Sequence, residues 1–147
     1  MLFRSNDFSI ENRGEILYYA CAVLNHNLYF YNISNKNNIY PIGKIKDDIN
    51  KYFLGFTNFK EKFIEKANNL KGSGYTFLVL NKTKLMIINT INEDSPYLYG
   101  YIPIICLDLW EHAYYLQYQN NRSLYIANFF NIIDFVKIND YYEKILQ

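Results

Sequence analysis

The spacing of apolar residues changes twice along the chain, and this change constrains the fold more than any other feature of the sequence. In the first half, apolar residues recur at helical intervals, for example at Ile16, Ala20 and Val23. Two β-rich runs separated by Asn81–Lys84 follow, then an apolar β-branched run, and helical spacing returns after Asp108. This order predicts an α+β fold in which helices flank a three-stranded antiparallel sheet.

The limits of these segments follow from capping and glycine signals. Ser9 or Asn12 can cap the first helix, Thr57 can cap the third, and Gly72–Gly74 is a signal that ends the third. The run 101–107 is apolar and β-branched, which predicts that it forms the central strand. We expect helices over about 11–32, 42–53, 58–70, 110–118, 123–133 and 139–146, and strands over about 75–80, 85–90 and 101–107.

Composition excludes several classes of protein. The 147 residues have the length of one domain, with 50% hydrophobic residues and a mean hydropathy of -0.20. The net charge of +1 argues against a dedicated nucleic-acid binder. No apolar run approaches the ~20 residues needed to cross a bilayer, so we expect no membrane partner. The first residues lack the pattern of a signal peptide, which predicts a cytoplasmic protein.

The two cysteines, Cys21 and Cys106, both lie among apolar residues. This setting predicts two small buried side chains and no disulfide, and it offers no basic neighbour that would activate a thiol. The sequence also lacks a P-loop, a dinucleotide-binding glycine motif, a serine-hydrolase elbow, an HExxH motif and a CxxC pair. The common motif-based nucleotide, hydrolase and zinc sites are therefore excluded.

The candidate chemistry lies with the only two histidines, His26 and His112, and with Asp108. Asp108 closes a buried strand, where an unpaired carboxylate is costly. His112 follows four residues later, and a turn at a strand end can direct both side chains to one point. Carboxylate and imidazole are common ligands of first-row metals. The spacing favours a metal site, while a hydrogen-bonded histidine stays open as an alternative.

The stretch Asp108–Tyr115, Asp-Leu-Trp-Glu-His-Ala-Tyr-Tyr, closely resembles the signature of the iron/manganese superoxide dismutases. The segment Asn25–Phe30, which contains His26, is similar to the second helix of that family. The resemblance covers about residues 15–146. The other matching segments, in family order, are 58–60, 72–75, 92–96 and 116–122.

This resemblance implies one iron or manganese ion per chain, held by three histidines and one aspartate together with a solvent molecule. His26 matches the second ligand, Asp108 the third and His112 the fourth. The first ligand lies on the first helix of an N-terminal helical hairpin, and no histidine precedes His26 here. We therefore interpret residues 1–38 as the remnant of that hairpin and residues 39–147 as the C-terminal α/β domain.

The resemblance also implies roles for residues around the metal. Family members place a glutamine against the metal-bound solvent, and its two possible positions here are Ala22 and Glu93. Glu93 would either carry a negative charge that favours the higher oxidation state or, if protonated, donate as a glutamine does. Two tryptophans that are usual in the family are replaced by Tyr75 and Phe77.

Two further positions imply a homodimer. Glu111 matches the residue that bridges to the ligand histidine of the partner subunit. Tyr114 matches a tyrosine that reaches the active-site funnel of the partner. On the resemblance, the two subunits would therefore meet through Glu111 and the region of His112.

The activity that the family implies is the conversion of superoxide to O₂ and hydrogen peroxide, in which the metal alternates between two oxidation states. This interpretation requires the missing first helix to precede the chain or to come from a separate polypeptide. An alternative is a catalytically impaired fragment or an interaction module, because the first histidine and the gateway tyrosine are absent. A third hypothesis, dioxygen activation at an open iron site, has only the open coordination in its favour.

Overall fold

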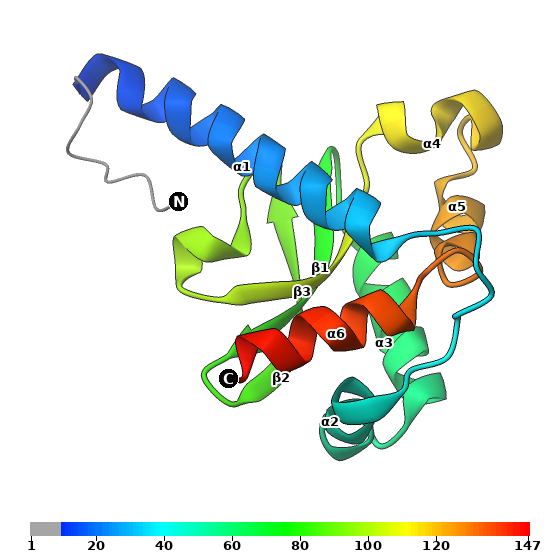
Figure 1. Cartoon of the computed structure of the whole chain (residues 1–147). Helices are drawn as coiled ribbons and strands as arrows, with labels where there is room; N and C mark the ends of the chain where they lie inside the picture. Colours follow the sequence, from blue (N-terminus) through cyan, green and yellow to red (C-terminus); the bar gives the residue numbers. More distant parts are fainter. Residues whose placement is uncertain (1–9) are drawn as a thin grey trace.

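The computed structural model describes residues 10–147, with side chains from Gly14 onward (Figure 1). The order of elements confirms the predicted α+β class. Ser9, one of the two candidate caps of the first helix, lies outside the described residues. The elements are α1 (Ile10–Asn32), α2 (Gly43–Phe53), α3 (Phe56–Asn68), β1 (Gly74–Asn81), β2 (Lys84–Ile91), the 3-10 turn η2 (Pro96–Tyr99), β3 (Ile102–Asp108), α4 (Glu111–Tyr118), α5 (Arg122–Phe129) and α6 (Phe135–Ile145).

The sheet has the order β2-β1-β3, and β1 pairs antiparallel with both neighbours. The prediction that the run 101–107 forms the central strand is therefore wrong, because β3 lies at an edge of the sheet. β3 is nonetheless buried over almost its whole length, since α1 and α6 pack against it. An edge strand that helices cover needs the same apolar composition as a central strand, so composition alone did not distinguish the two.

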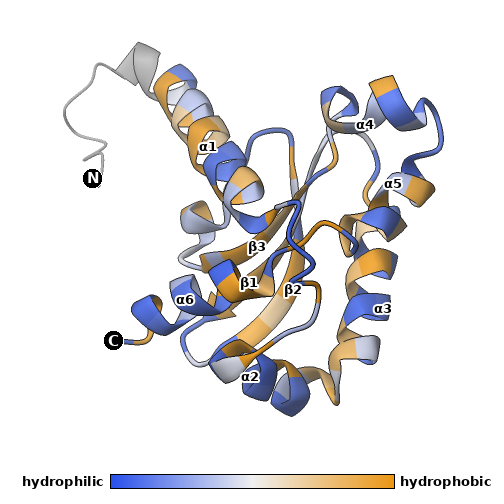
Figure 2. Cartoon of the chain, turned by 45° about the vertical axis from the view of Figure 1, so that its right-hand side comes forward, coloured by the Kyte–Doolittle hydropathy of each residue, from blue (hydrophilic) through white to orange (hydrophobic). Residues whose placement is uncertain are grey.

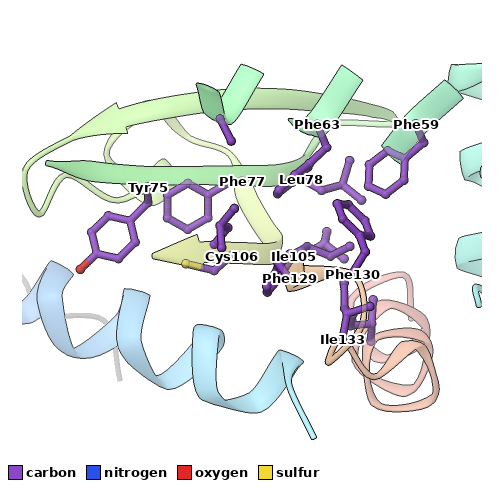
Figure 3. Packing of buried hydrophobic residues seen from close by; sticks show 14 of the residues in the cluster. Phe59, Phe63, Tyr75, Phe77, Leu78, Ile105, Cys106, Phe129, Phe130 and Ile133 are labelled. Atoms are coloured by element: carbon purple, nitrogen blue, oxygen red, sulfur yellow. The ribbon is translucent and has the colours of Figure 1, made fainter. Parts of the chain in front are cut away.

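Helices cover the sheet and enclose an aromatic core. α1 and α6 contact β3, while α3 contacts β1 and β2, and Figure 2 shows the hydrophobic strands lying between these helices. Figure 3 shows the rings of α3, β1 and the end of α5 packed together with Leu78 and Ile105. The packed rings are Phe59, Phe63, Phe77, Phe129 and Phe130, all buried.

No helix within residues 10–147 is both long enough and apolar enough to cross a membrane.

Two helices begin where backbone geometry and capping dictate. α3 starts at Phe56, and the residue before it is Gly55, whose φ of 122° favours glycine. The prediction that Thr57 caps this helix is wrong, because Thr57 already lies within it. α6 starts at Phe135, four residues before the expected position, because Asp134 accepts hydrogen bonds from two backbone N–H groups of its first turn.

Asp134 also ties the loop after α1 to α6. Its Oδ1 accepts from Asn38 at 3.0 Å, and its Oδ2 accepts from the Ser34 hydroxyl at 2.9 Å. Burial raises the pKa of Asp134. These hydrogen bonds and those from the backbone N–H groups of Val136 and Lys137 lower the pKa by more than burial raises it. The net pKa of the carboxyl therefore lies below its usual value, and the ionised form stabilises the fold.

We expect the Asp134→Ala variant to lose about 1–2 kcal/mol of the free energy of unfolding at neutral pH. Because the pKa is depressed in the folded state, this contribution is present above the unfolded pKa of ~3.9 and is lost as pH falls through the folded value. Urea unfolding of both proteins at about pH 6 and about pH 2 measures the difference. An equal difference at the two pH values would contradict this assignment, and Asp134→Asn, which keeps an acceptor, should lose less at neutral pH.

Candidate metal centre

Three side chains from distant parts of the chain meet beside one end of the sheet. His26 lies in the second half of α1, Asp108 is the last residue of β3, and His112 lies in the first turn of α4. Asp108 Oδ2 is 3.3 Å from His26 Nε2 and 3.0 Å from His112 Nε2, and the two Nε2 atoms are 3.4 Å apart. The structure thus brings together both histidines and the aspartate that the sequence singled out.

Asp108 is positioned by three interactions that leave one carboxylate oxygen for the histidines. Its backbone pairs with Tyr75 of β1, and its carbonyl accepts from the Tyr125 hydroxyl at 2.8 Å. Its Oδ1 accepts from the backbone N–H of Trp110 at 2.9 Å. This hydrogen bond closes the turn that ends β3 and leads into α4. The residue is only 1% exposed. Oδ2 is therefore the oxygen directed at the two imidazoles.

His26 is held in one tautomer by its own helix. Its Nδ1 lies 2.7 Å from the carbonyl oxygen of Ala22, which can only accept, so Nδ1 carries a proton and donates. In the neutral ring, the lone pair of Nε2 then faces Asp108 Oδ2 and His112 Nε2. A lone pair directed at a carboxylate oxygen is unfavourable unless a proton or a metal ion lies between them. The backbone bond of Nδ1 is the usual arrangement behind a ligand histidine.

His112 is supported by an aromatic neighbour and lies at the open side of the cluster. Its ring stacks on that of Trp110 with centroids 5.8 Å apart and an interplanar angle of 12°. Trp110 is itself fixed, because its Nε1 donates to the carbonyl oxygen of Asn92 at 3.2 Å. The side chain of His112 is 54% exposed, while that of Asp108 is 2% exposed. A small solute therefore has access to the cluster from the side of His112.

The three donors fit a first-row transition metal. A point equidistant from the three atoms lies about 1.9 Å from each, close to the ~2.0–2.2 Å bonds that imidazole and carboxylate make to such ions. Two imidazoles and one carboxylate are a donor set typical of iron sites with open positions. Of the ligand set that the sequence implied, the described residues supply His26, Asp108 and His112 at one point.

Glu93 lies in the turn after β2, where it is 6% exposed. Its Oε2 accepts a hydrogen bond of 2.7 Å from the hydroxyl of Tyr75. Ala22, the other position at which the family places its glutamine, reaches the cluster only through its backbone carbonyl. Of these two positions, Glu93 therefore carries a buried ionisable side chain and Ala22 does not.

The two α4 residues that the sequence assigned to contacts with a partner subunit, Glu111 and Tyr114, differ in exposure. Glu111 is exposed, so its carboxylate is free to contact another chain. Tyr114 is only 7% exposed and stacks on Tyr125 with centroids 5.2 Å apart. The expectation that Tyr114 reaches the active-site funnel of a partner stays a prediction. Tyr115, at 53% exposed, is the outward-facing tyrosine of this helix.

Two residues near the cluster were not identified from the sequence. Tyr125 anchors the carbonyl of Asp108 and also lies 3.2 Å, between hydroxyl oxygens, from Tyr29. No motif marks Tyr125, so only the structure could find it. Asn25 is buried beside His26 and donates to the carbonyl oxygen of Glu93 at 3.0 Å. Its position next to His26 in the sequence was the available signal for Asn25.

Comparison with known proteins identifies the family that this chain resembles. The family model described as "Iron/manganese superoxide dismutases, C-terminal domain" matches residues 41–141. Asp108 and His112 lie within this match, and His26 precedes it.

Curated relatives extend the similarity beyond that domain. A manganese superoxide dismutase of Listeria ivanovii is 41% identical over 129 residues, which is 88% of this chain and 64% of the relative. A protein named superoxide dismutase Mn/Fe 2 from Staphylococcus aureus (strain bovine RF122 / ET3-1) is 42% identical over 119 residues, covering 81% of this chain and 59% of the relative. The chain thus spans about three-fifths of the length of the relatives it matches.

Proposed function

The chain belongs to the iron/manganese superoxide dismutase family, and from this premise we propose that it binds iron or manganese and converts superoxide to O₂ and hydrogen peroxide. The observation that carries the proposal is the convergence of His26, Asp108 and His112 with their donor atoms 3.0–3.4 Å apart. The named relatives are manganese or manganese/iron enzymes, which supports the choice of metal.

The three converging residues would hold one ion per chain. A bound iron or manganese ion would supply the one-electron oxidation and reduction that the disproportionation of superoxide requires. The protein contributes position: Ala22 fixes the tautomer of His26, and Trp110 fixes one oxygen of Asp108. The buried carboxylate of Asp108 is the anionic donor of the cluster, which favours a multivalent cation.

Access and charge at the centre are set by different residues. The half-exposed ring of His112 lies on the open side, where a two-atom anion can approach. The buried Glu93 adds a second carboxylate in the region, and a negative charge near the metal favours its higher oxidation state. We propose Glu93 as the residue that takes the place of the family's glutamine.

Further parts of the proposal concern organisation. We place the boundary between the N-terminal segment with α1 and the C-terminal α/β domain at residues 38 and 39, which the family match beginning at residue 41 supports. The exposed Glu111 on α4 supports a homodimer formed through the region of His112. The two free, buried cysteines suit a reducing compartment, and we propose an antioxidant role in the cytoplasm.

The direct test is superoxide consumption by the purified chain. The metal-free chain is loaded with Mn(II) or Fe(II) without oxygen, freed of excess ion, and analysed for metal content. Superoxide decay is then followed by stopped-flow absorbance with the metal-free chain as the control. The proposal predicts decay that scales with bound metal. A folded chain that retains no metal, or holds it without turnover, would support the impaired fragment instead.

A further inference from the structure

Tyr75 and Glu93 form a buried pair beside the metal centre. The Tyr75 hydroxyl donates to Glu93 Oε2 at 2.7 Å, a short bond to an ionisable acceptor. Tyr75 is fully buried and Glu93 is 6% exposed, so water cannot easily replace either partner. Figure 3 shows the ring of Tyr75 extending from β1 toward α1, the helix that carries His26.

The turn that carries Glu93 is attached to the elements that hold the ligands. Asn25, next to His26 on α1, donates to the carbonyl oxygen of Glu93 at 3.0 Å. Trp110, which stacks on His112, donates to the carbonyl oxygen of Asn92 at 3.2 Å. The backbone of residues 92–93 is thus bonded to residues adjacent to two ligands. The backbone alone does not orient the Glu93 carboxylate, and the Tyr75 hydroxyl is the side-chain donor bonded to it.

Tyr75 is itself rigid and in contact with the centre. Its backbone pairs with Asp108 in the sheet, and its ring meets that of His26 edge-on with centroids 5.9 Å apart. Burial, followed by the bonded carboxylate of Glu93, raises the pKa of Tyr75 far above its usual value. The hydroxyl therefore keeps its proton and acts as a donor. Few rotamers are open to a ring that is enclosed on all sides.

We propose that Tyr75 is a positioning residue that fixes the Glu93 carboxylate beside the three-ligand cluster and so determines the charge that a bound metal experiences. This inference rests on the proposed function. Glu93 and Tyr75 stand where the family resemblance implies glutamine and tryptophan, and the two departures meet in one hydrogen bond. The pair is therefore a feature of this chain that distinguishes its centre from one with a neutral amide.

A double-mutant cycle on the metal-free chain tests whether Tyr75 holds Glu93. In the Tyr75→Phe variant a buried carboxylate loses its charge-assisted partner, and we expect the melting temperature to fall by about 6 °C. In the Glu93→Gln background the same change breaks only a neutral bond and should cost about 2 °C. Equal losses in both backgrounds would overturn the proposed coupling.

The second readout is the charge-transfer absorption of the iron-loaded chain, which a purely structural role would not move. We expect the Tyr75→Phe variant to shift this band in the native background and to leave it unchanged in the Glu93→Gln background. Tyr142→Phe is the matched control. Tyr142, on α6, is also a buried tyrosine whose hydroxyl donates to a carboxylate, that of Asp48 on α2, at 2.7 Å. This variant should lower stability without moving the band.

The outcomes separate this inference from the proposed function. Iron bound with the same absorption band in wild type and Tyr75→Phe would overturn the inference alone. A wild-type chain that binds no iron would overturn the proposed function and the inference with it.

Discussion

The Asp108→Ala variant is expected to bind manganese or iron about 100-fold or more weakly than the wild type. Asp108 Oδ2 is the shared neighbour of both imidazoles and the one anionic donor in the cluster. Without it, the two Nε2 atoms alone provide a neutral donor pair for a multivalent cation. Titration of each metal-free protein with Mn(II) or Fe(II), followed by elemental analysis after gel filtration, measures the loss.

The matched control for this variant is Asp108→Asn. An asparagine keeps an oxygen that can accept from the backbone N–H of Trp110, so the turn into α4 should persist. We expect the fold of Asp108→Asn, measured by circular dichroism, to match the wild type while metal binding still falls strongly. Native metal content in a folded Asp108→Asn protein would contradict the role of this carboxylate.

The largest loss of stability is expected for Phe63→Ala in α3. Phe63 is fully buried, and its ring lies within 6.2 Å, between centroids, of those of Phe59, Phe129 and Phe130. Truncation removes this contact surface and leaves a cavity, which typically costs about 3–5 kcal/mol. Urea unfolding monitored by circular dichroism measures the change in the free energy of unfolding.

The neighbouring Lys62 provides the control for this truncation. Lys62 is exposed on the same helix, so Lys62→Ala should change the free energy of unfolding by less than about 0.5 kcal/mol. Similar losses in the two variants would show that Phe63 stabilises α3 itself and not the packing of α3 against α5.

Much of the fold was predictable because its elements have distinct local patterns. The hairpin of β1 and β2 follows from two β-rich runs and a short polar turn, and α3 follows from its amphipathic spacing. The order of strands was not predictable, because β3 owes its burial to α1 and α6. The start of α6 was also missed, although Asp134 is a local cap whose side chain accepts from the backbone N–H groups of Val136 and Lys137.

Some residues of the candidate site also have a local sequence signal, while others do not. Asp108 and His112 are marked by local spacing at the end of a strand. His26 lies 86 residues before His112, and only the family resemblance connected them before the structure did. Tyr125 supports Asp108 from another helix, a long-range contact with no local signal.

The different burial of Tyr114 and Tyr115 also has a local explanation. Tyr114 and Tyr115 are consecutive on a helix, where one position rotates a side chain by ~100°. The motif alone gave the pair, while the packing of Tyr114 on Tyr125 decided which of the two is buried.

Anomalous X-ray diffraction from crystals of the chain loaded with manganese or iron tests the central claim most directly. The account predicts one anomalous peak per chain, at bonding distance from Nε2 of His26, Oδ2 of Asp108 and Nε2 of His112. A peak bound by other residues, or a loaded crystal without a peak between these three side chains, would contradict it.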